Sequence, residues 1–253
     1  MQRSIDLNAD LGESFGTWPM GDDAAMFRLV SSANVACGFH AGDARTMVES
    51  VRLASTHGVA LGAHPGYRDL AGFGRRHLAV DPDELAAELA YQLGALDGIA
   101  RGAGLRVRYV KAHGALYHRL TVDAAAARAI ADTVAAFDGE LVILGAPGGA
   151  LEHATDAAGL RFAREAFVDR AYLADGSLVP RGEAGAVVHD ADAAAERAVE
   201  LAVTGGIAAD DGARVDLAPD SLCLHGDTPG AVQIAIAVRR ALEAAGVEVR
   251  AFA

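Results

Sequence analysis

Short apolar stretches alternate along the chain with longer segments in which apolar residues recur at helical spacing. The longer segments predict helices, and the short stretches, rich in Val, Leu and Ala, predict strands. A chain of strands and helices in units of roughly 30 residues is typical of a parallel sheet with right-handed crossovers. Six or seven inner strands fit a closed barrel better than an open sheet. The predicted strands are residues 4–7, 33–37, 59–63, 106–110, 141–144, 160–163 and 221–224, with a terminal strand at 247–252.

Residue types at the segment ends mark several helix boundaries. Asp43 is a suitable N-cap for a helix that Gly58 would end. Asp81, Pro82 and Glu84 together have the pattern of a capping box with proline in the first turn. Further helices are predicted at residues 123–136 and 190–203, and a last one is predicted to begin at Thr228 and Pro229 and to reach residue 245.

Composition narrows the class of protein. The chain has 253 residues, of which 52% are hydrophobic, and it contains no linker or low-complexity segment, so we expect one domain over residues 1–253. A formal charge of −12 argues against binding to nucleic acid or to an anionic membrane. The start of the chain has no apolar leader and no stretch is long enough to span a membrane, which predicts a cytoplasmic protein. Cys37 and Cys223 lie in apolar runs, and we expect them to be buried and unpaired.

Polar residues gather at the first predicted strand and the loop after it. They are Asp6, Asn8, Asp10 and Glu13, and the first three share side-chain parity, so they are expected to point together into the mouth of a barrel. Clustered carboxylates suit proton transfer or cation binding. The alternative is a hydrogen-bonded turn, since Asp and Asn are common where strands end.

Four histidines follow strands and stand next to or near glycine: His40, His64, His113 and His225. The carboxyl ends of parallel strands converge on one face, so these side chains are expected to share a pocket. Histidine there can act as a general base or as a metal ligand, and a structural role is the alternative.

Several cations and carboxylates also follow strands, although Arg181 follows no clear strand. Lys111 could bind a phosphate or stabilise an oxyanion, while Arg170 and Arg181, and secondarily Arg75 and Arg76, could bind a carboxylate. Asp227 has an equally good explanation as the residue before the last helix. The glycine-rich loop at residues 145–149 could accept a phosphate. No P-loop, GxGxxG, GxSxG or HExxH motif is present, which argues against a serine-triad hydrolase or a zincin.

Seven motifs in order give the chain a resemblance to the LamB/YcsF family. They are DLNADLGE, SANVACGFHAGD, GAHPGYRDLAGFGRR, KAHGALYH, REAFVDRAY, LVPR and LCLHGDTPGA. Two departures stand out: Ala9 occupies a position where the family commonly has cysteine, and Ala112 and His118 stand where it usually has proline and asparagine. The first departure argues against a cysteine nucleophile shared by the family.

The resemblance implies a single seven-stranded parallel β/α barrel, similar to the glycoside hydrolase/deacetylase superfamily. It also implies the A component of an ATP-dependent 5-oxoprolinase, which converts 5-oxo-L-proline to L-glutamate with ATP as co-substrate and subunits B and C as partners. The resemblance does not decide whether a divalent metal is bound or whether the chain forms a homo-oligomer. The candidate metal ligands are Asp10, His64 and His113.

These considerations give each candidate residue a role. The catalytic set is Asp10, His64, Lys111, His113 and Glu165, and the substrate-binding set is Asp6, Asn8, Glu13, His40, Asp43, Arg170, Arg181, His225 and Asp227. Two other functions remain as alternatives. One is a metal-dependent deacetylase or amidohydrolase, and the other is a metabolite-binding protein without chemistry of its own.

Overall fold

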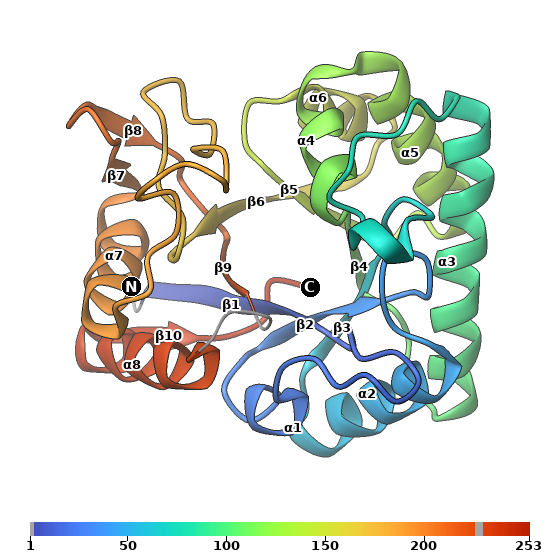
Figure 1. The fold of residues 1–253 in the computed structure, drawn as a ribbon, viewed down its shortest axis with the longest axis horizontal. Coiled ribbons are helices and arrows are strands. Elements are labelled where there is room, and N and C mark those ends of the chain that lie inside the picture. The colour runs from blue at the N-terminus through green and yellow to red at the C-terminus, as the bar shows by residue number, and fades with distance from the viewer. Residues whose placement is uncertain (1–2, 226–229) are drawn as a thin grey trace.

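Seven parallel strands form a closed barrel in the computed structural model, which describes residues 3–225 and 230–253 (Figure 1). Each strand pairs with the next, and the last pairs back onto the first, which closes the ring. The prediction of a seven-stranded parallel barrel is therefore confirmed. In order around the ring, the strands are β1 (Arg3–Leu11), β2 (Ser32–Ala36), β3 (Ala60–His64), β4 (Tyr109–Lys111), β5 (Val142–Gly145), β6 (Arg161–Phe167) and β9 (Ser221–His225).

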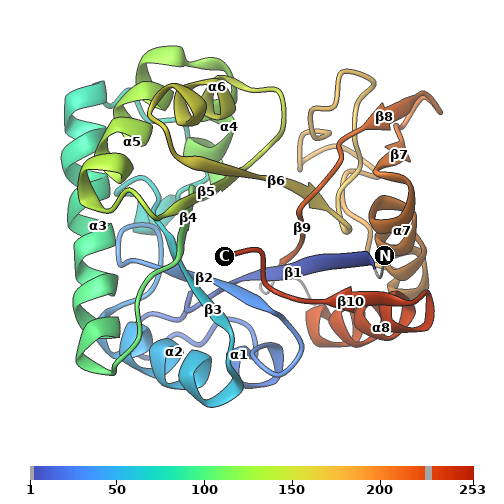
Figure 2. The ribbon, with the colours of Figure 1, turned by 180° about the vertical axis from the view of Figure 1, so that it is seen from behind.

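Helices surround the barrel on the outside, as Figures 1 and 2 show from opposite sides. The predicted caps are present: Asp43 accepts a hydrogen bond from the Thr46 backbone, and Gly58 ends the same helix in the left-handed conformation. Asp81 caps the next long helix, with Pro82 in its first turn. The helices are α1 (Asp23–Met26), α2 (Ala44–His57), α3 (Pro82–Gly102), α4 (Gly114–Val122), α5 (Ala124–Phe137), α6 (Ala150–Ala157), α7 (Ala191–Thr204) and α8 (Ala231–Ala244), with a 3-10 turn η1 (Leu70–Gly72).

Two strands are longer than predicted. β1 extends to Leu11 instead of residue 7, so Asn8 and Asp10 lie on the strand and not in the loop after it. β6 likewise extends to Phe167, which places Glu165 inside the strand. Both errors have the same cause. In the sequence these polar residues indicated a loop, but in the structure they point into the barrel and contact other polar groups there.

Other elements were missed or shifted. Helix α4 follows His113 directly, where no helix was predicted, and a two-stranded antiparallel sheet of β7 (Gly206–Ala208) and β8 (Arg214–Asp216) lies outside the barrel. The predicted strand 106–110 is observed as β4, which begins at Tyr109. The terminal strand β10 (Val247–Val249) is shorter than predicted and pairs with the start of β1. The predicted start of the last helix at Thr228 and Pro229 lies outside the described residues.

Apolar side chains fill the layer between strands and helices. The buried face of α3, for example, presents Leu85, Leu89, Leu93 and Leu96. Cys37 and Cys223 are buried and unpaired, as expected. Among the described residues, no helix combines the length and apolar character that crossing a bilayer requires. The hydrophobic layer thus lies outside the strands, and polar residues are free to occupy the interior of the barrel.

Candidate functional site

Inside the barrel, near the start of β9, one carboxylate is surrounded by hydroxyls. Asp6 accepts hydrogen bonds from Ser31 at 2.7 Å, from Ser32 at 2.6 Å and from Ser221. Burial raises the pKa of Asp6 to about 6, although the three hydroxyls act in the opposite direction. Asp6 is not among the residues that line the cavity described below. Asp6 therefore belongs to a hydrogen-bond network inside the barrel. Its predicted contact with the substrate stays a prediction.

A pair of asparagines connects this region to the barrel mouth. Asn34 Nδ2 donates to Asn8 Oδ1 at 2.7 Å and to Asp10 Oδ1 at 2.8 Å. Asn34 Oδ1 in turn accepts from the Tyr109 hydroxyl at 2.6 Å. Asn34 was missed because it lies within an otherwise apolar strand. The register of β1 against β2, which pairs Asp10 with Asn34, brings these side chains together.

Lys111 lies at the centre of the barrel between two carboxylates. Its ammonium nitrogen is 2.9 Å from Asp10 Oδ1 and 2.8 Å from Glu165 Oε1, and 3.1 Å from the sulfur of Cys223. The side chain is almost completely buried. Burial lowers the pKa of Lys111, but Asp10 and Glu165 outweigh this and hold it well above its usual range. The predicted convergence of Asp10, Lys111 and Glu165 from three strands is present.

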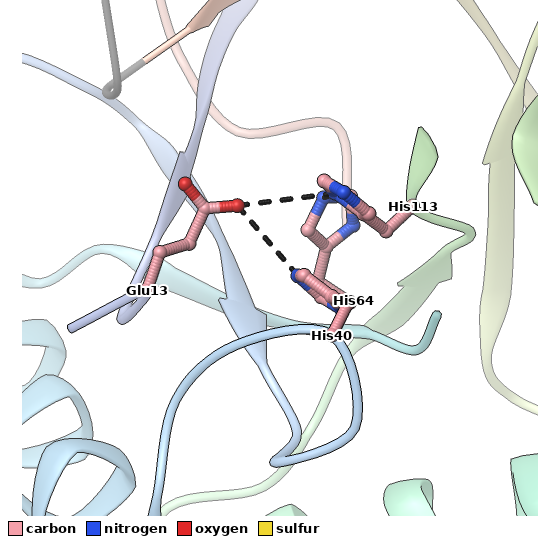
Figure 3. Close-up of side chains that lie close together, drawn as sticks. All are labelled: Glu13, His40, His64 and His113. Carbon is pink, nitrogen blue, oxygen red and sulfur yellow. Dashed lines mark hydrogen bonds and ion pairs between the residues drawn. The ribbon is translucent and has the colours of Figure 1, made fainter. Parts of the chain in front are cut away.

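Beside Lys111 and its two carboxylate partners, Glu13 and three histidines form a buried cluster (Figure 3). Each of the four offers one ligand atom, and these atoms all lie within 4.8 Å of one another. His64 Nε2 is 3.1 Å from His113 Nδ1, and Glu13 Oε1 is 3.6 Å from His40 Nε2 and 3.8 Å from His113 Nδ1. Glu13 comes from the loop after β1, His40 from the loop after β2, and His64 from the end of β3. The arrangement is that of a candidate metal site.

Backbone carbonyls fix two of the three imidazole rings. His64 Nδ1 is 2.8 Å from the Lys111 carbonyl oxygen, and His113 Nε2 is 2.9 Å from that of Phe73. The third ring, His40, stacks on His113 with ring centroids 3.7 Å apart. Burial, together with the neighbouring histidines, lowers the pKa of His40 and of His113 well below the usual range, so both rings are neutral.

Two glycines leave room for these rings. A Cβ atom at Gly66 would lie 2.6 Å from His40 Nδ1, and one at Gly74 would lie 2.7 Å from His40 Cβ and 2.9 Å from His113 Cδ2. Gly74 also has a positive φ of 62°. Both glycines lie in the GAHPGYRDLAGFGRR motif, so that motif provides space for the cluster as well as a ligand.

A cavity of about 630 Å³ opens beside the cluster, at the carboxyl ends of the strands. It is large enough for a small metabolite. Seven of the predicted site residues line it: Asp10, His64, Lys111, His113, Arg170, Arg181 and His225. Arg75, which the sequence also offered as a carboxylate-binding residue, lines the cavity too. Further lining residues were not among the predicted site residues: His77, Tyr117, His118, Arg119 and Phe167.

The far side of the cavity is formed around His225 and Arg170. His225 Nδ1 is 2.7 Å from Asp169 Oδ2, and this contact, against the effect of burial, lowers the pKa of Asp169. Arg170 donates from Nε to the Ala186 carbonyl and from one terminal nitrogen to that of Val179. Arg170 therefore holds the irregular segment 171–188 in place, and that segment brings Arg181 to the cavity.

Among the described residues, Asn8 and Asp43 were also predicted to be at the site but do not line the cavity. Asn8 contacts Lys111 at 3.4 Å from the interior side. Asp43 accepts backbone hydrogen bonds from Thr46 and Gly16 as the cap of α2, and it does not line the cavity. Asp227 lies outside the described residues. Most of the predicted set is thus gathered at one face, and Asp43 is the clear exception.

The glycine-rich loop after β5 lines a second cavity of about 820 Å³. The amide of Gly148 already donates to Glu152 Oε2 at 2.6 Å. Carboxylates from Glu152, Asp156, Asp175 and Asp216 also line this space. Their charge disfavours the phosphate site that the glycine pattern suggested.

Comparison with known proteins gives full-length matches. The family described as LamB/YcsF matches residues 5–253. A protein of Streptomyces avermitilis, named as the A component of 5-oxoprolinase, is 57% identical over 249 residues, which cover 98% of this chain and 100% of that protein. One of Nocardia farcinica with the same name is 56% identical over 252 residues, with 98% and 99% covered.

Solved structures agree on the fold. The lactam utilization protein from Thermus thermophilus superposes with a TM-score of 0.94 at 50% identity, over 98% of this chain and 100% of that one. A family 4 carbohydrate esterase from Streptomyces lividans gives a TM-score of 0.50 at 11% identity, over 99% and 93% of the two chains. At such low identity the second likeness shows the fold alone, and it agrees with the expected β/α barrel.

Proposed function

The chain belongs to the LamB/YcsF family, and we propose that it is the A component of an ATP-dependent 5-oxoprolinase, which opens 5-oxo-L-proline to L-glutamate. The observation that carries this proposal is 57% identity to a relative with that name, over 98% of this chain and 100% of that protein. The cavity at the barrel mouth supports it, because it combines carboxylate, imidazole and cationic groups next to a space of metabolite size.

The proposed reaction explains why ATP is needed. A five-membered lactam is an unreactive amide, and phosphorylation of its oxygen would give an imidate whose ring carbon is open to attack by water. The overall reaction consumes 5-oxo-L-proline, ATP and two waters and gives L-glutamate, ADP and phosphate. ATP is then a co-substrate of the assembled enzyme, and subunits B and C are the proposed partners.

Asp10 is the proposed acceptor of the proton from the attacking water. Burial raises the pKa of its carboxyl, but His64 and Lys111 outweigh this and hold the pKa well below its usual range. Asp10 is therefore ionised at neutral pH and lines the cavity with one oxygen in contact with Lys111. In this proposal Asp10, with His64 or His113, positions and deprotonates the water.

Cationic side chains would hold the rest of the substrate. Lys111 would stabilise negative charge on the phosphate or on the oxyanion formed at the ring carbon. Arg170 and Arg181 line the opposite part of the cavity and would bind the carboxylate of 5-oxo-L-proline. Arg170 already uses two of its guanidinium nitrogens for backbone carbonyls, so Arg181 is the better candidate for a two-point contact.

An omission assay tests the proposal. The chain is mixed with subunits B and C, 5-oxo-L-proline and ATP, and glutamate release is followed while each component is left out in turn. We expect glutamate only when this chain, both partners and ATP are present. Glutamate release at the same rate without this chain would reject the proposed function. The same assay on cytoplasmic extract and on membranes tests the proposed cytoplasmic location.

A further inference from the structure

We propose that Glu13, His40, His64 and His113 bind one divalent transition-metal ion at the barrel mouth. This set differs from the candidate ligands expected from the sequence, because Glu13 and His40 take the place of Asp10. The inference goes beyond the proposed function and does not depend on it. It rests on how the four side chains are held and on what each one faces.

The first argument is the direction of the imidazole lone pairs. A carbonyl oxygen only accepts hydrogen bonds, so the ring nitrogen that faces it must carry the proton. His64 Nδ1 faces the Lys111 carbonyl and His113 Nε2 faces that of Phe73, so both protons point away from the cluster. The other nitrogen of the His113 ring, Nδ1, then points its lone pair at His64 Nε2 from 3.1 Å.

The lone pair of His113 Nδ1 thus faces a second ring nitrogen, and a positive centre between these two atoms would stabilise it. The carboxylates beside them are acceptors as well: Glu13 Oε1 lies 3.8 Å from His113 Nδ1, and Asp10 Oδ1 lies 3.4 Å from His64 Nε2. The cluster thus directs acceptors at one point, which is the arrangement that a bound cation stabilises.

The spacing fits a metal ion. Two imidazole nitrogens bound to one ion at about 2.0–2.1 Å lie roughly 2.9–3.4 Å apart in octahedral or tetrahedral geometry. The observed 3.1 Å between His64 Nε2 and His113 Nδ1 is within that range. Ligating histidines also commonly donate their second ring N–H to a backbone carbonyl, as both of these do.

His40 supplies a second, independent indication. Its side chain is fully buried, and neither ring nitrogen has a hydrogen-bond partner among the described residues. Leaving such a buried group without a partner is unfavourable. Its Nε2 is 3.6 Å from Glu13 Oε1, and the missing Cβ of Gly66 leaves room for the ring in this position.

The donor set indicates the class of metal. Three imidazoles and one carboxylate suit borderline ions such as Zn²⁺ or Co²⁺, whereas Mg²⁺ and Ca²⁺ prefer oxygen ligands. His64 and His113 line the cavity, so the ion would lie at its wall. Metal binding would occupy the lone pairs of both rings, and Asp10 alone would then remain to accept the proton from the water.

Metal content of the purified chain tests the inference. The chain is treated with a chelator, dialysed against Zn²⁺ or Co²⁺ and then against buffer, and its metal is measured by mass spectrometry, with the visible spectrum recorded for Co²⁺. We expect about one ion per chain and a Co²⁺ spectrum with nitrogen and oxygen ligands. Less than about one ion in ten folded chains would overturn the inference, and this result needs no variant.

Variants then test the ligand set. His64→Gln and Glu13→Gln keep the shape of the site and should weaken metal binding at least tenfold, while His189→Ala removes an exposed histidine outside the cluster and should leave binding unchanged. Far-UV circular dichroism checks that each variant is folded. Wild-type affinity in folded His64→Gln and Glu13→Gln would contradict the assignment.

The outcome is separable from that of the proposed function. Metal content is measured without substrate, ATP or partner subunits. A chain that binds one ion but supports no glutamate release would reject the proposed reaction and leave the metal site standing. A chain that holds no ion yet supports glutamate release would reject the metal site and leave the proposed reaction standing.

Discussion

The buried ammonium of Lys111 offers a sharp test of the barrel interior. Lys111→Met removes the charge but keeps a side chain of similar length. The variant leaves Asp10 and Glu165 facing each other across the interior without the cation that contacts both, at 2.9 and 2.8 Å. The side chains of all three residues are at most 10% exposed, so water cannot replace the lost contacts well.

The size of the effect follows from these distances. At an effective dielectric constant of about 20, each contact has a gross attraction of about 6 kcal/mol, much of which offsets the cost of burying the charges. Removing one partner of a buried ion pair typically costs about 3–5 kcal/mol, because the remaining charge is buried and uncompensated. We expect Lys111→Met to lower the free energy of unfolding by that amount.

Urea unfolding followed by circular dichroism measures the loss. The double variant Lys111→Met/Glu165→Gln provides the matched control, because it removes one of the two uncompensated carboxylates. It should be about 2 kcal/mol more stable than Lys111→Met alone. A free energy of unfolding for Lys111→Met within about 1 kcal/mol of wild type, or a double variant whose loss equals the sum of the single losses, would refute the reasoning.

Three further outcomes are expected. Asp6→Asn should gain stability relative to wild type as pH rises: the carboxyl has a pKa of about 6 when folded and 3.8 as the reference value, so wild type loses stability from roughly pH 4 to pH 6. Urea unfolding of both proteins at pH 4.5 and at pH 7 measures this effect: the difference between their free energies of unfolding should change by about 2 kcal/mol. A difference that is the same at both pH values would contradict the raised pKa. Arg181→Gln should raise the KM for 5-oxo-L-proline at least tenfold with kcat little changed in the assembled enzyme, whereas an unchanged KM would exclude Arg181 from substrate binding. His113→Ala should abolish glutamate release by the assembled enzyme while the chain stays folded, and undiminished turnover would reject its assigned role.

The sequence predicted the barrel, its seven strands and seven of the residues that line the cavity at its mouth. Helix caps such as Asp43 and Asp81 were correct because capping depends on local backbone geometry. The shared parity of Asp6, Asn8 and Asp10 was also correct, since a strand places alternate side chains on one face. These features depend on neighbouring residues alone.

What failed depends on contacts between distant segments. The polar residues Asn8 and Asp10 were assigned to a loop because their partners, Asn34 on β2 and Lys111 on β4, are invisible to a local pattern. The grouping of Glu13 and His40 with the other histidines likewise arises only when the loops after β1 and β2 meet. The carboxylate of Asp43 caps α2, as predicted, and its role in substrate binding stays a prediction.

Glutamate release by the complex assembled with Asp10→Asn tests the central claim most directly, because Asp10 is the proposed proton acceptor whether or not a metal is bound. Asparagine has nearly the same shape but cannot accept the proton from water. We predict that the ATP-dependent rate falls at least about 100-fold, while the variant chain stays folded and still assembles with its partners. A rate within about threefold of wild type would contradict the account.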